Sequence, residues 1–420
     1  MRILQINTVY DTGSTGRIVA GLYNEALKSG YDPYAAFSRS DLPEGTNGYT
    51  IGNKVDFMCH VAQDILFDES GFGSKKETEK FLKWVDEIKP DIIHLHNIHG
   101  FYLQIEILFD YIKKKNIPVV WTLHDCWPVT GHCAYFDYLG CNKWKTGCKK
   151  CPQHLQSYPY SIIDKSEGNY LRKKKAFSNV SNMVIVTPSK WLSDIVKMSF
   201  LKDYSVKIIP NGIDMEQFNS THDGLVLSSE KRQIILGVAN VWTKRKGLKC
   251  FEELAGLIDH EKFVVYLVGV NSFQKQSLKT KFENRIVGIQ HTSSTKELAE
   301  LYSRALCFVN MTLEDNFPTT NLEALACGTP VITFRTGGSP EAIDETCGYV
   351  VKKNGISQVY EKIIEVSNRG KARYTEKCRA KALSYSESRR FLEYMQVYKN
   401  ACSNTTKHIC NHTSGGNRDR

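Results

Sequence analysis

The chain lacks any long hydrophobic run. Within its 420 residues no apolar stretch approaches the roughly 18 residues that a membrane-spanning helix needs. The N-terminus, MRILQINTVY, has a short apolar centre with no small-residue cleavage site after it, so it predicts a first strand rather than a secretory signal. No short-period repeat is present either. These absences predict a cytoplasmic protein without a membrane-spanning helix.

The chain also has neither the basic helix nor the aromatic platform that marks known nucleic-acid-binding modules. Its net charge is nevertheless +10, and the basic runs KKK at 113–115, KWKTGCKK at 143–150 and RKKK at 172–175 all lie in the first half. Such runs are usually solvated surfaces. Here they favour anionic partners, namely diphosphate substrates or the anionic lipid of the inner leaflet, over nucleic acid.

The pattern along the chain is typical of a two-domain α/β protein. Hydrophobic residues make up 41% and charged residues 24%, as in ordinary globular proteins. Short β-branched runs alternate with longer helical stretches, which predicts βαβ units and two doubly wound parallel sheets in series. Strands are predicted at 3–7, 92–95, 119–123, 184–187 and 206–210, and then at 234–238, 263–268, 306–310 and 331–334.

Turn and helix signals predict the domain boundaries. The Asn-Gly turn in PNGID, at 210–214, separates a domain at 1–209 from one at 210–385. Aromatic residues at helical spacing (Phe391, Tyr394 and Tyr398) predict a last helix at 386–401. The tail at 402–420 is rich in Asn, Thr, Ser and Gly and is predicted to be disordered.

The most informative segment is DNFPTTNLEALACGTP, at 315–330. It places Asp315 in a loop and Glu323 eight positions later in a short helix. Glu323 can accept hydrogen bonds from ribose hydroxyls, and Asp315 from the hydroxyls of a hexose. The N–H groups at the helix start can face phosphate, which adds a group of candidate binding residues: Thr319, Thr320 and Asn321. The alternative is a core helix with surface carboxylates.

A basic turn in the second domain suits a diphosphate. The residues 243–247, TKRKG, follow the predicted strand at 234–238 and open a helix. Arg245 and Lys246 could neutralise two phosphates at this point. A solvated basic turn is the alternative.

The first domain has two candidate groups at predicted strand ends, where ligands bind in such folds. The loop DTGSTGR, at 11–17, offers tight backbone and donors that suit a phosphate, or it is only a turn; its candidate residues are Gly13, Ser14, Thr15, Gly16 and Arg17. The second group is histidine: His96 and His99 follow one strand and His124 the next. A lone buried histidine is more often structural, but several at adjacent strand ends favour a site, in which Asp125 could orient His124.

Five of the 13 cysteines fall in one irregular segment, at 126–151. Cys148 and Cys151 have the two-residue gap with which two thiolates hold one metal, and Cys133 and Cys141 would complete a tetrahedral structural zinc site. Cys126 or His132 could replace one ligand. Free thiols or a redox pair are the alternatives.

Taken in order, these motifs resemble the signature of the retaining nucleotide-sugar glycosyltransferases of family 4. The resemblance covers the chain to about residue 400 and extends, through the Cys-rich insertion, to a subgroup associated with bacterial exopolysaccharide assembly of the colanic-acid type. It implies the GT-B fold, with two Rossmann-like domains facing a cleft. A UDP- or GDP-linked sugar would bind mainly on the second domain and a glycan or lipid-linked acceptor mainly on the first.

The resemblance also assigns roles. His124 would approach the donor sugar, the last helix would cross back onto the first domain, and PNGID would line the cleft through Asn211. Phe317 and Pro318 belong to the donor motif. Lys246 matches the lysine that holds the leaving diphosphate, so no catalytic metal is expected.

Two departures from the family pattern leave other functions open. The family has glutamate where this chain has Asp315, with Glu314 directly before it. Ala239 and Asn240 stand where arginine is usual, and Arg245 is the nearest guanidinium. A nucleotide-sugar-binding protein without catalysis is therefore one alternative, and a zinc-organised binding module is another.

Overall fold

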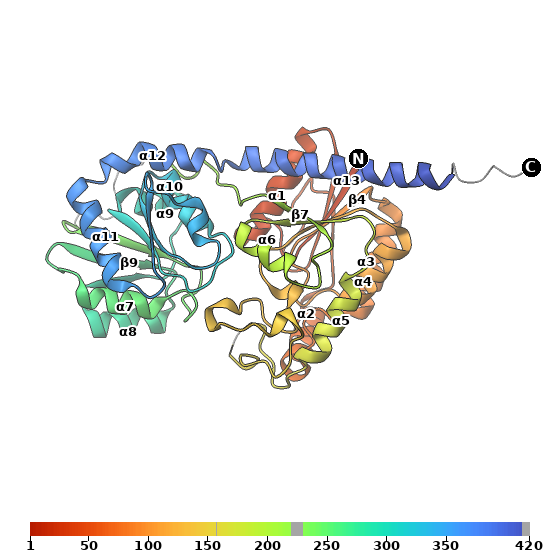
Figure 1. The fold of residues 1–420 in the computed structure, drawn as a ribbon, viewed down its shortest axis with the longest axis horizontal. Coiled ribbons are helices and arrows are strands. Elements are labelled where there is room, and N and C mark those ends of the chain that lie inside the picture. The colour runs from red at the N-terminus through yellow and green to blue at the C-terminus, as the bar shows by residue number, and fades with distance from the viewer. Residues whose placement is uncertain (157, 220–229, 414–420) are drawn as a thin grey trace, which may run out of the picture. The chain divides into compact units, whose positions relative to one another are not determined.

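The structure, a computed structural model, describes residues 1–156, 158–219 and 230–413, with side chains as far as Ser403. It divides the chain into two compact units. The first unit is Met1–Pro210 together with the chain from Arg390 onward, and the second is Asn211–Arg389. Each unit has its own parallel sheet with helices packed against it (Figure 1).

Over the described residues, the first unit contains a seven-stranded sheet in the order β3-β2-β1-β4-β5-β6-β7, and all neighbouring strands are parallel. The order reverses between β1 and β4, which makes that point the topological switch. The strands are β1 (Arg2–Ile6), β2 (Asp32–Phe37), β3 (Gly48–Thr50), β4 (Ile92–Leu95), β5 (Val119–Thr122), β6 (Met183–Thr187) and β7 (Ser205–Ile208). The helices are α1 (Gly13–Lys28), α2 (Lys54–Phe67), α3 (Lys75–Ile88), α4 (Ile105–Lys115), α5 (Ser166–Phe177) and α6 (Lys190–Lys197).

The described part of the second unit contains a six-stranded parallel sheet in the order β10-β9-β8-β11-β12-β13, with its switch between β8 and β11. Its strands are β8 (Gln233–Val238), β9 (Phe263–Val268), β10 (Ile286–Ile289), β11 (Cys307–Asn310), β12 (Val331–Phe334) and β13 (Gly348–Val351). Its helices are α7 (Leu248–Leu257), α8 (Ser272–Phe282), α9 (Thr295–Arg304), α10 (Thr319–Ala326), α11 (Ile356–Arg369) and α12 (Ala372–Leu383). The predicted fold, with two doubly wound sheets, is confirmed.

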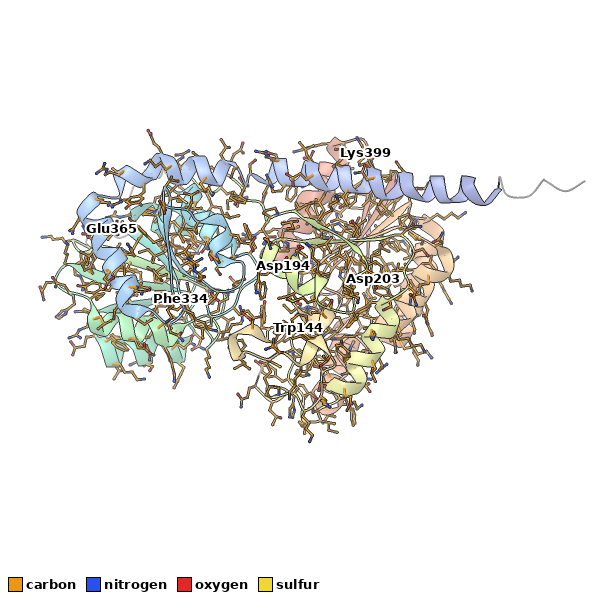
Figure 2. All side chains as sticks on the ribbon, viewed as in Figure 1. Trp144, Asp194, Asp203, Phe334, Glu365 and Lys399 are labelled. Atoms are coloured by element: carbon orange, nitrogen blue, oxygen red, sulfur yellow. The ribbon has the colours of Figure 1, made fainter. Side chains whose placement is uncertain are left out.

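Burial on both faces explains why these strands read as continuous apolar runs. All six residues of β9 (FVVYLV) are buried, as are all four of β12, which ends at the fully buried Phe334 (Figure 2). In the first unit Trp121 of β5 packs against Phe109 of α4 and Phe177 of α5, with ring centroids 5.5 and 4.8 Å away. Helices therefore cover both faces of each sheet. The loops at the strand ends are the places where polar groups remain accessible to a ligand.

The last helix, α13 (Glu387–Thr413), corrects the predicted disorder of the tail. The helix was expected to end at 401, but it continues through Cys402, whose Sγ lies 3.5 Å from Sδ of Met1. A helical turn fixed by packing at this point lets each following residue add one backbone hydrogen bond at little cost. Residues 414–420 of the predicted tail lie outside the described residues.

The apolar face of α13 belongs to the core of the first unit. Phe391, Tyr394, Met395 and Tyr398 are buried in one cluster with strand residues such as Ile3. The ring of Phe391 lies directly over Gly21 of α1. The sheet of the first unit is therefore covered on one face by a helix that follows the whole second unit in sequence.

We expect Phe391→Ala to lower the free energy of unfolding of the first unit by about 3–5 kcal/mol, because it removes a buried ring and leaves a cavity. Leu392→Ala is the matched control, since Leu392 is 55% exposed, and its cost should stay near 0.5 kcal/mol. Denaturant unfolding, followed by a spectroscopic probe located in the first unit, measures the free energy of unfolding of both variants. Equal effects of the two substitutions would show that α13 does not stabilise this core.

Candidate active site

The switch point of the second unit brings two cations and an acid together. Arg245 and Lys246 lie in the loop after β8, and Asp315 lies in the loop after β11, on the other side of the switch. Lys246 Nζ lies 2.5 Å from Asp315 Oδ2, and Arg245 Nη1 lies 3.8 Å from the same oxygen. Arg245 Nη1 also donates to the carbonyl oxygen of Glu314 at 2.6 Å. Residues 69 positions apart in sequence thus form one charged cluster.

Two glycines permit the close backbone approach that holds this cluster. Gly247 has φ of +80°, and a Cβ there would lie 2.2 Å from the carbonyl oxygen of Met311. Gly337 has φ of +54°, and a Cβ there would lie 2.1 Å from the carbonyl oxygen of Asp315. Any larger residue would push the loops after β8, β11 and β12 apart.

The electrostatics of the cluster favour an ionised Asp315. Burial alone would raise the pKa of Asp315, but Lys246 and Arg245 outweigh burial and lower it. Its Oδ1 accepts the backbone N–H of Asn316 at 2.9 Å. In this arrangement Asp315 holds the lysine, whereas the sequence predicted that it would accept hydrogen bonds from a hexose. Glu314, the acid directly before Asp315, is fully buried.

The second predicted acid, Glu323, is positioned by a tyrosine that the sequence reasoning missed. Tyr302 of α9 donates its hydroxyl to Glu323 Oε2 at 2.9 Å, and Tyr302 is fully buried. Burial, and then the charge of Glu323, raise the pKa of that phenol, so it stays a donor. The two residues lie 21 positions apart in different elements, so no local motif could reveal the pair.

The start of α10 carries the remaining predicted donor-side residues. Thr319 and Thr320 are its first two residues, half-buried, and no side chain caps the helix start. Asn321 accepts from Asn310 Nδ2 at 2.8 Å and donates to the carbonyl oxygen of Ser339 at 3.0 Å. These bonds fix the helix between the ends of β11 and β12.

The predicted residues just before α10 also come together. Asn211 Nδ2 donates to the carbonyl oxygen of Phe317 at 2.9 Å, across 106 positions of sequence. Phe317 is buried, and Pro318 occupies the N-cap position of α10. The PNGID turn therefore contacts the donor motif within the second unit.

In the first unit, the predicted histidines do gather at the ends of β4 and β5. His96 Nδ1 lies 3.1 Å from His124 Nε2, and the two rings stack with centroids 5.4 Å apart. Burial lowers the pKa of His124 to about 4 and that of His96 well below its usual value. Both rings are therefore neutral near pH 7.

Asp125 pairs with a different histidine from the one expected. Its Oδ2 lies 3.0 Å from His99 Nε2, and its Oδ1 accepts the backbone N–H of Trp127 at 2.9 Å. His124 is held by His96 instead, so the predicted orientation of His124 by Asp125 is wrong. His124 and Asp125 lie in the bend after β5, so their side chains need not face the same partner.

Two buried histidine nitrogens in this cluster, His96 Nε2 and His99 Nδ1, have no hydrogen-bond partner among the described residues. Buried polar atoms are normally paired, so these two nitrogens call for a partner, which a bound water or ligand would supply. His94 of β4, which was not predicted as a site residue, packs against His96 in this cluster. It bonds to Thr122 at 2.8 Å and to Tyr398 of α13 at 2.7 Å.

The predicted glycine loop lies at the carboxyl end of β1, beside the same switch point. Gly13 begins α1 with φ of +65°, and Gly16 is buried. Ser14 and Arg17 are exposed and Thr15 is half-buried. No side chain caps this helix start, so its N–H groups face outward where a polar ligand could bind.

The cysteine segment is irregular, as expected, with only short 3₁₀ turns at 127–129, 137–139 and 143–145. Cys133 donates a hydrogen bond to Cys151, which lowers the pKa of Cys151 to about 6. Cys148 interacts with Cys141 and Cys151 only at longer range. Within the described residues no three His, Cys, Asp or Glu side chains lie close enough to hold a metal ion. The four thiols would have to move closer together to bind zinc, which stays a prediction.

Metal analysis of the purified chain tests that prediction. A four-thiolate site predicts about one zinc per chain, and loss of that zinc in Cys151→Ser. Cys59→Ser is the matched control, because Cys59 is an exposed thiol outside the segment. A chain without zinc, whose four thiols all react with a thiol reagent, would establish free cysteines instead.

Comparison with known proteins agrees with the two units. A family model described as Glycosyltransferase Family 4 matches residues 16–217, and one described as Glycosyl transferases group 1 matches residues 225–396. A curated relative, a putative colanic acid biosynthesis glycosyl transferase of Escherichia coli strain K12, is 25% identical over 95% of this chain and 100% of its own length.

Solved structures share the fold across the chain. Sucrose-phosphate synthase from Thermosynechococcus elongatus superposes with a TM-score of 0.74 at 16% identity, covering 96% of this chain and 99% of its own. Anabaena HepE, solved in complex with UDP, has a TM-score of 0.63 at 14% identity, covering 95% of this chain and 100% of its own.

Two doubly wound domains of this kind define the GT-B fold. The chain belongs to the glycosyltransferases, with a family 4 domain followed by a group 1 domain. It is therefore an enzyme that transfers a glycosyl group. Among its described residues no helix is both long and apolar enough to cross a membrane.

Proposed function

We propose that this enzyme transfers a sugar from a UDP- or GDP-linked donor to a hydroxyl of a glycan or lipid-linked acceptor, with retention at the anomeric carbon. The setting would be bacterial surface polysaccharide synthesis. The single observation that carries the proposal is the cluster of Arg245, Lys246 and Asp315 at the switch point of the second sheet. The name of the Escherichia coli relative supports the setting.

The cluster suits a leaving diphosphate. As the bond between the anomeric carbon and the phosphate oxygen breaks, negative charge grows on the diphosphate. Two cations against one carboxylate leave a net positive site, already fixed in place by Gly247 and Gly337. Pre-positioned charge of this kind stabilises a transition state without reorganisation, and the start of α10 adds backbone N–H groups. These residues supply the charge stabilisation for which other enzymes use a metal ion.

Glu323 would bind the ribose. Its carboxylate is half-exposed and accepts the hydroxyl of Tyr302 at Oε2. A carboxylate has about four acceptor positions on its two oxygens, so this side chain could also accept hydrogen bonds from the paired hydroxyls of a ribose. UDP is the first nucleotide to test, because the Anabaena structure holds UDP.

The acceptor would bind on the first unit, where neutral His124 and His96 lie at the strand ends. A neutral imidazole can donate or accept a hydrogen bond to a sugar hydroxyl without adding charge near the donor. The alternative of a binding protein without catalysis is less well supported, because Arg245 does reach Asp315 and provides the second cation.

Thermal unfolding against UDP, GDP, ADP and CMP, alone and as sugar conjugates, tests donor binding. A ligand at 100 times its dissociation constant should stabilise the chain by roughly 2.7 kcal/mol. We expect a shift with UDP or GDP conjugates that is much smaller in Glu323→Gln, because the amide accepts fewer hydrogen bonds. Glu361→Gln is the control on the exposed surface of α11. A shift that is equal in both variants would remove Glu323 from the site.

The charge role of Lys246 is tested by turnover. Lys246→Ala should lower kcat by a factor on the order of 10², because the transition state loses a cation. Lys249→Ala removes an exposed lysine three residues later and should leave kcat unchanged. Donor hydrolysis or transfer to a soluble acceptor, once the donor is known, provides the assay. Unchanged turnover in Lys246→Ala contradicts the assignment.

A further inference from the structure

Helix α2 buries its polar side and exposes its apolar side, the reverse of an ordinary surface helix. Its buried residues are polar, namely His60 and Asp64. Its exposed face is apolar and follows helical spacing along the full length of the helix: Val55, Met58, Cys59, Ala62, Ile65 and Leu66. Met58 is 62% exposed and Val55 69%. A surface helix normally buries its apolar stripe against the core.

The buried polar side of α2 is held through His60, whereas Asp64 Oδ1 has no hydrogen-bond partner among the described residues. His60 bonds to Ser74 Oγ at 2.8 Å and accepts the backbone N–H of Gly73 at 3.1 Å. An Asn53 side chain caps the helix start by accepting two backbone N–H groups. Rotating the helix to bury its apolar stripe would break these contacts, so the stripe must face outward.

A second segment extends this apolar surface. The backbone N–H of Ile162 donates to the carbonyl oxygen of Ile65 at 2.7 Å, which joins the loop residues 155–156 and 158–163 to the end of α2. The loop exposes Leu155, Tyr160, Ile162 and Ile163, each by 45% or more. In Figure 1 α2 and the loops that precede α5 lie at the same end of the first unit. We call these residues, together with Val55, Met58, Ile65, Leu66 and Phe67, the α2 surface.

Positive charge borders the α2 surface. Residues 143–175 hold nine Lys and Arg against two Asp and Glu. Of these, Lys173 is buried, and Lys165 and Arg172 pair with Glu69 and Glu106. Lys149 and Lys150 are exposed, and the Cys151 N–H that follows them donates to Asp164 at 2.6 Å, next to the apolar loop. Lys165 extends over the ring of Phe67, with Nζ 5.3 Å from its centroid.

We propose that the α2 surface docks on an anionic lipid bilayer. Aliphatic side chains, a tyrosine and bordering lysines match the composition of interfacial membrane-binding surfaces, which insert apolar residues to the level of the acyl chains and leave lysines at the headgroups. A neutral or acidic protein partner would use the same apolar area, but it would not require charge on the lipid. The docking would be peripheral.

The α2 surface lies close to the histidine cluster, which would bind the acceptor if the proposed function holds. Tyr158 lies between the α2 surface and the histidine cluster, with its ring 6.0 Å from that of His99 and 5.8 Å from that of Phe101. The ring of Phe57, on α2, lies 6.0 Å from Phe101. Ring contacts through Phe101 and Tyr158 therefore connect α2 with His99, so an acceptor anchored in the bilayer would be held close to the histidine cluster.

The test is flotation of the full chain with vesicles of phosphatidylcholine alone, or with phosphatidylglycerol added. We expect binding only to the anionic vesicles, and at least a tenfold weaker partition for the double variant Leu66→Asp with Ile162→Asp. Phe273→Asp is the matched control, since Phe273 is 83% exposed but isolated in the second unit, on α8. A second variant, Lys149→Glu with Lys150→Glu, should weaken binding to anionic vesicles without removing apolar area.

Several outcomes would overturn the proposal. Equal binding by wild type and the α2-surface variant would place the contact elsewhere. Self-association of the chain that the same substitutions abolish would show that a second copy covers the surface. Vesicle binding is measured without donor or acceptor, so it succeeds or fails independently of the nucleotide shifts that test the transferase function. Unchanged thermal unfolding of each variant shows that the loss is not misfolding.

Discussion

The charged site depends on how closely three loops can approach one another. Gly247 lies against the carbonyl oxygen of Met311, and Gly337 lies against that of Asp315, so the loops after β8, β11 and β12 meet at backbone distance. Only then can a lysine from the first loop reach an aspartate from the second at 2.5 Å. The parallel sheet brings the three loops to the same edge, because all its strands end there. The glycines then let the backbones of these loops come into contact.

The Lys246–Asp315 pair also explains how a partly buried site tolerates its own charge. Isolated cations at this position would be costly to desolvate, and the carboxylate offsets that cost before any ligand binds. A bound diphosphate would compete with Asp315 for Lys246 and Arg245. Because the cations are already fixed, little reorganisation would accompany the growth of charge on the leaving group. An aspartate has a shorter side chain than the glutamate of the family pattern, which suits this direct contact with the lysine.

The sequence predicted the order of elements well, because apolar strand runs and helical spacing are local signals. The nine predicted strands are present, and His96, His124, Lys246 and Glu323 lie at strand ends or on α10 as expected. The missed strands are short or open on weak β formers, as in β2, which starts Asp-Pro. The partners were not predictable: Tyr302 with Glu323, and Asp125 with His99, pair through tertiary packing rather than spacing. The tail was misread because composition does not show that α13 is anchored on Tyr398 and Cys402.

The side of helix α2 that is buried could not be predicted from the sequence. Its apolar stripe has the spacing of a core helix, and nothing in the sequence says which side faces the sheet. The structure decides this through His60, whose contacts with Ser74 and Gly73 hold that side of the helix inward. Contiguous exposed apolar surface bordered by polar residues is typical of an interaction site. The stripe, the described residues of the loop before α5 and the bordering lysines lie beside the histidine cluster, so the part of the first unit that would receive an acceptor is the part suited to a bilayer. An acceptor held in two dimensions at a membrane would meet the site far more often than one free in solution, because tethering raises the effective concentration without any new contact at the site.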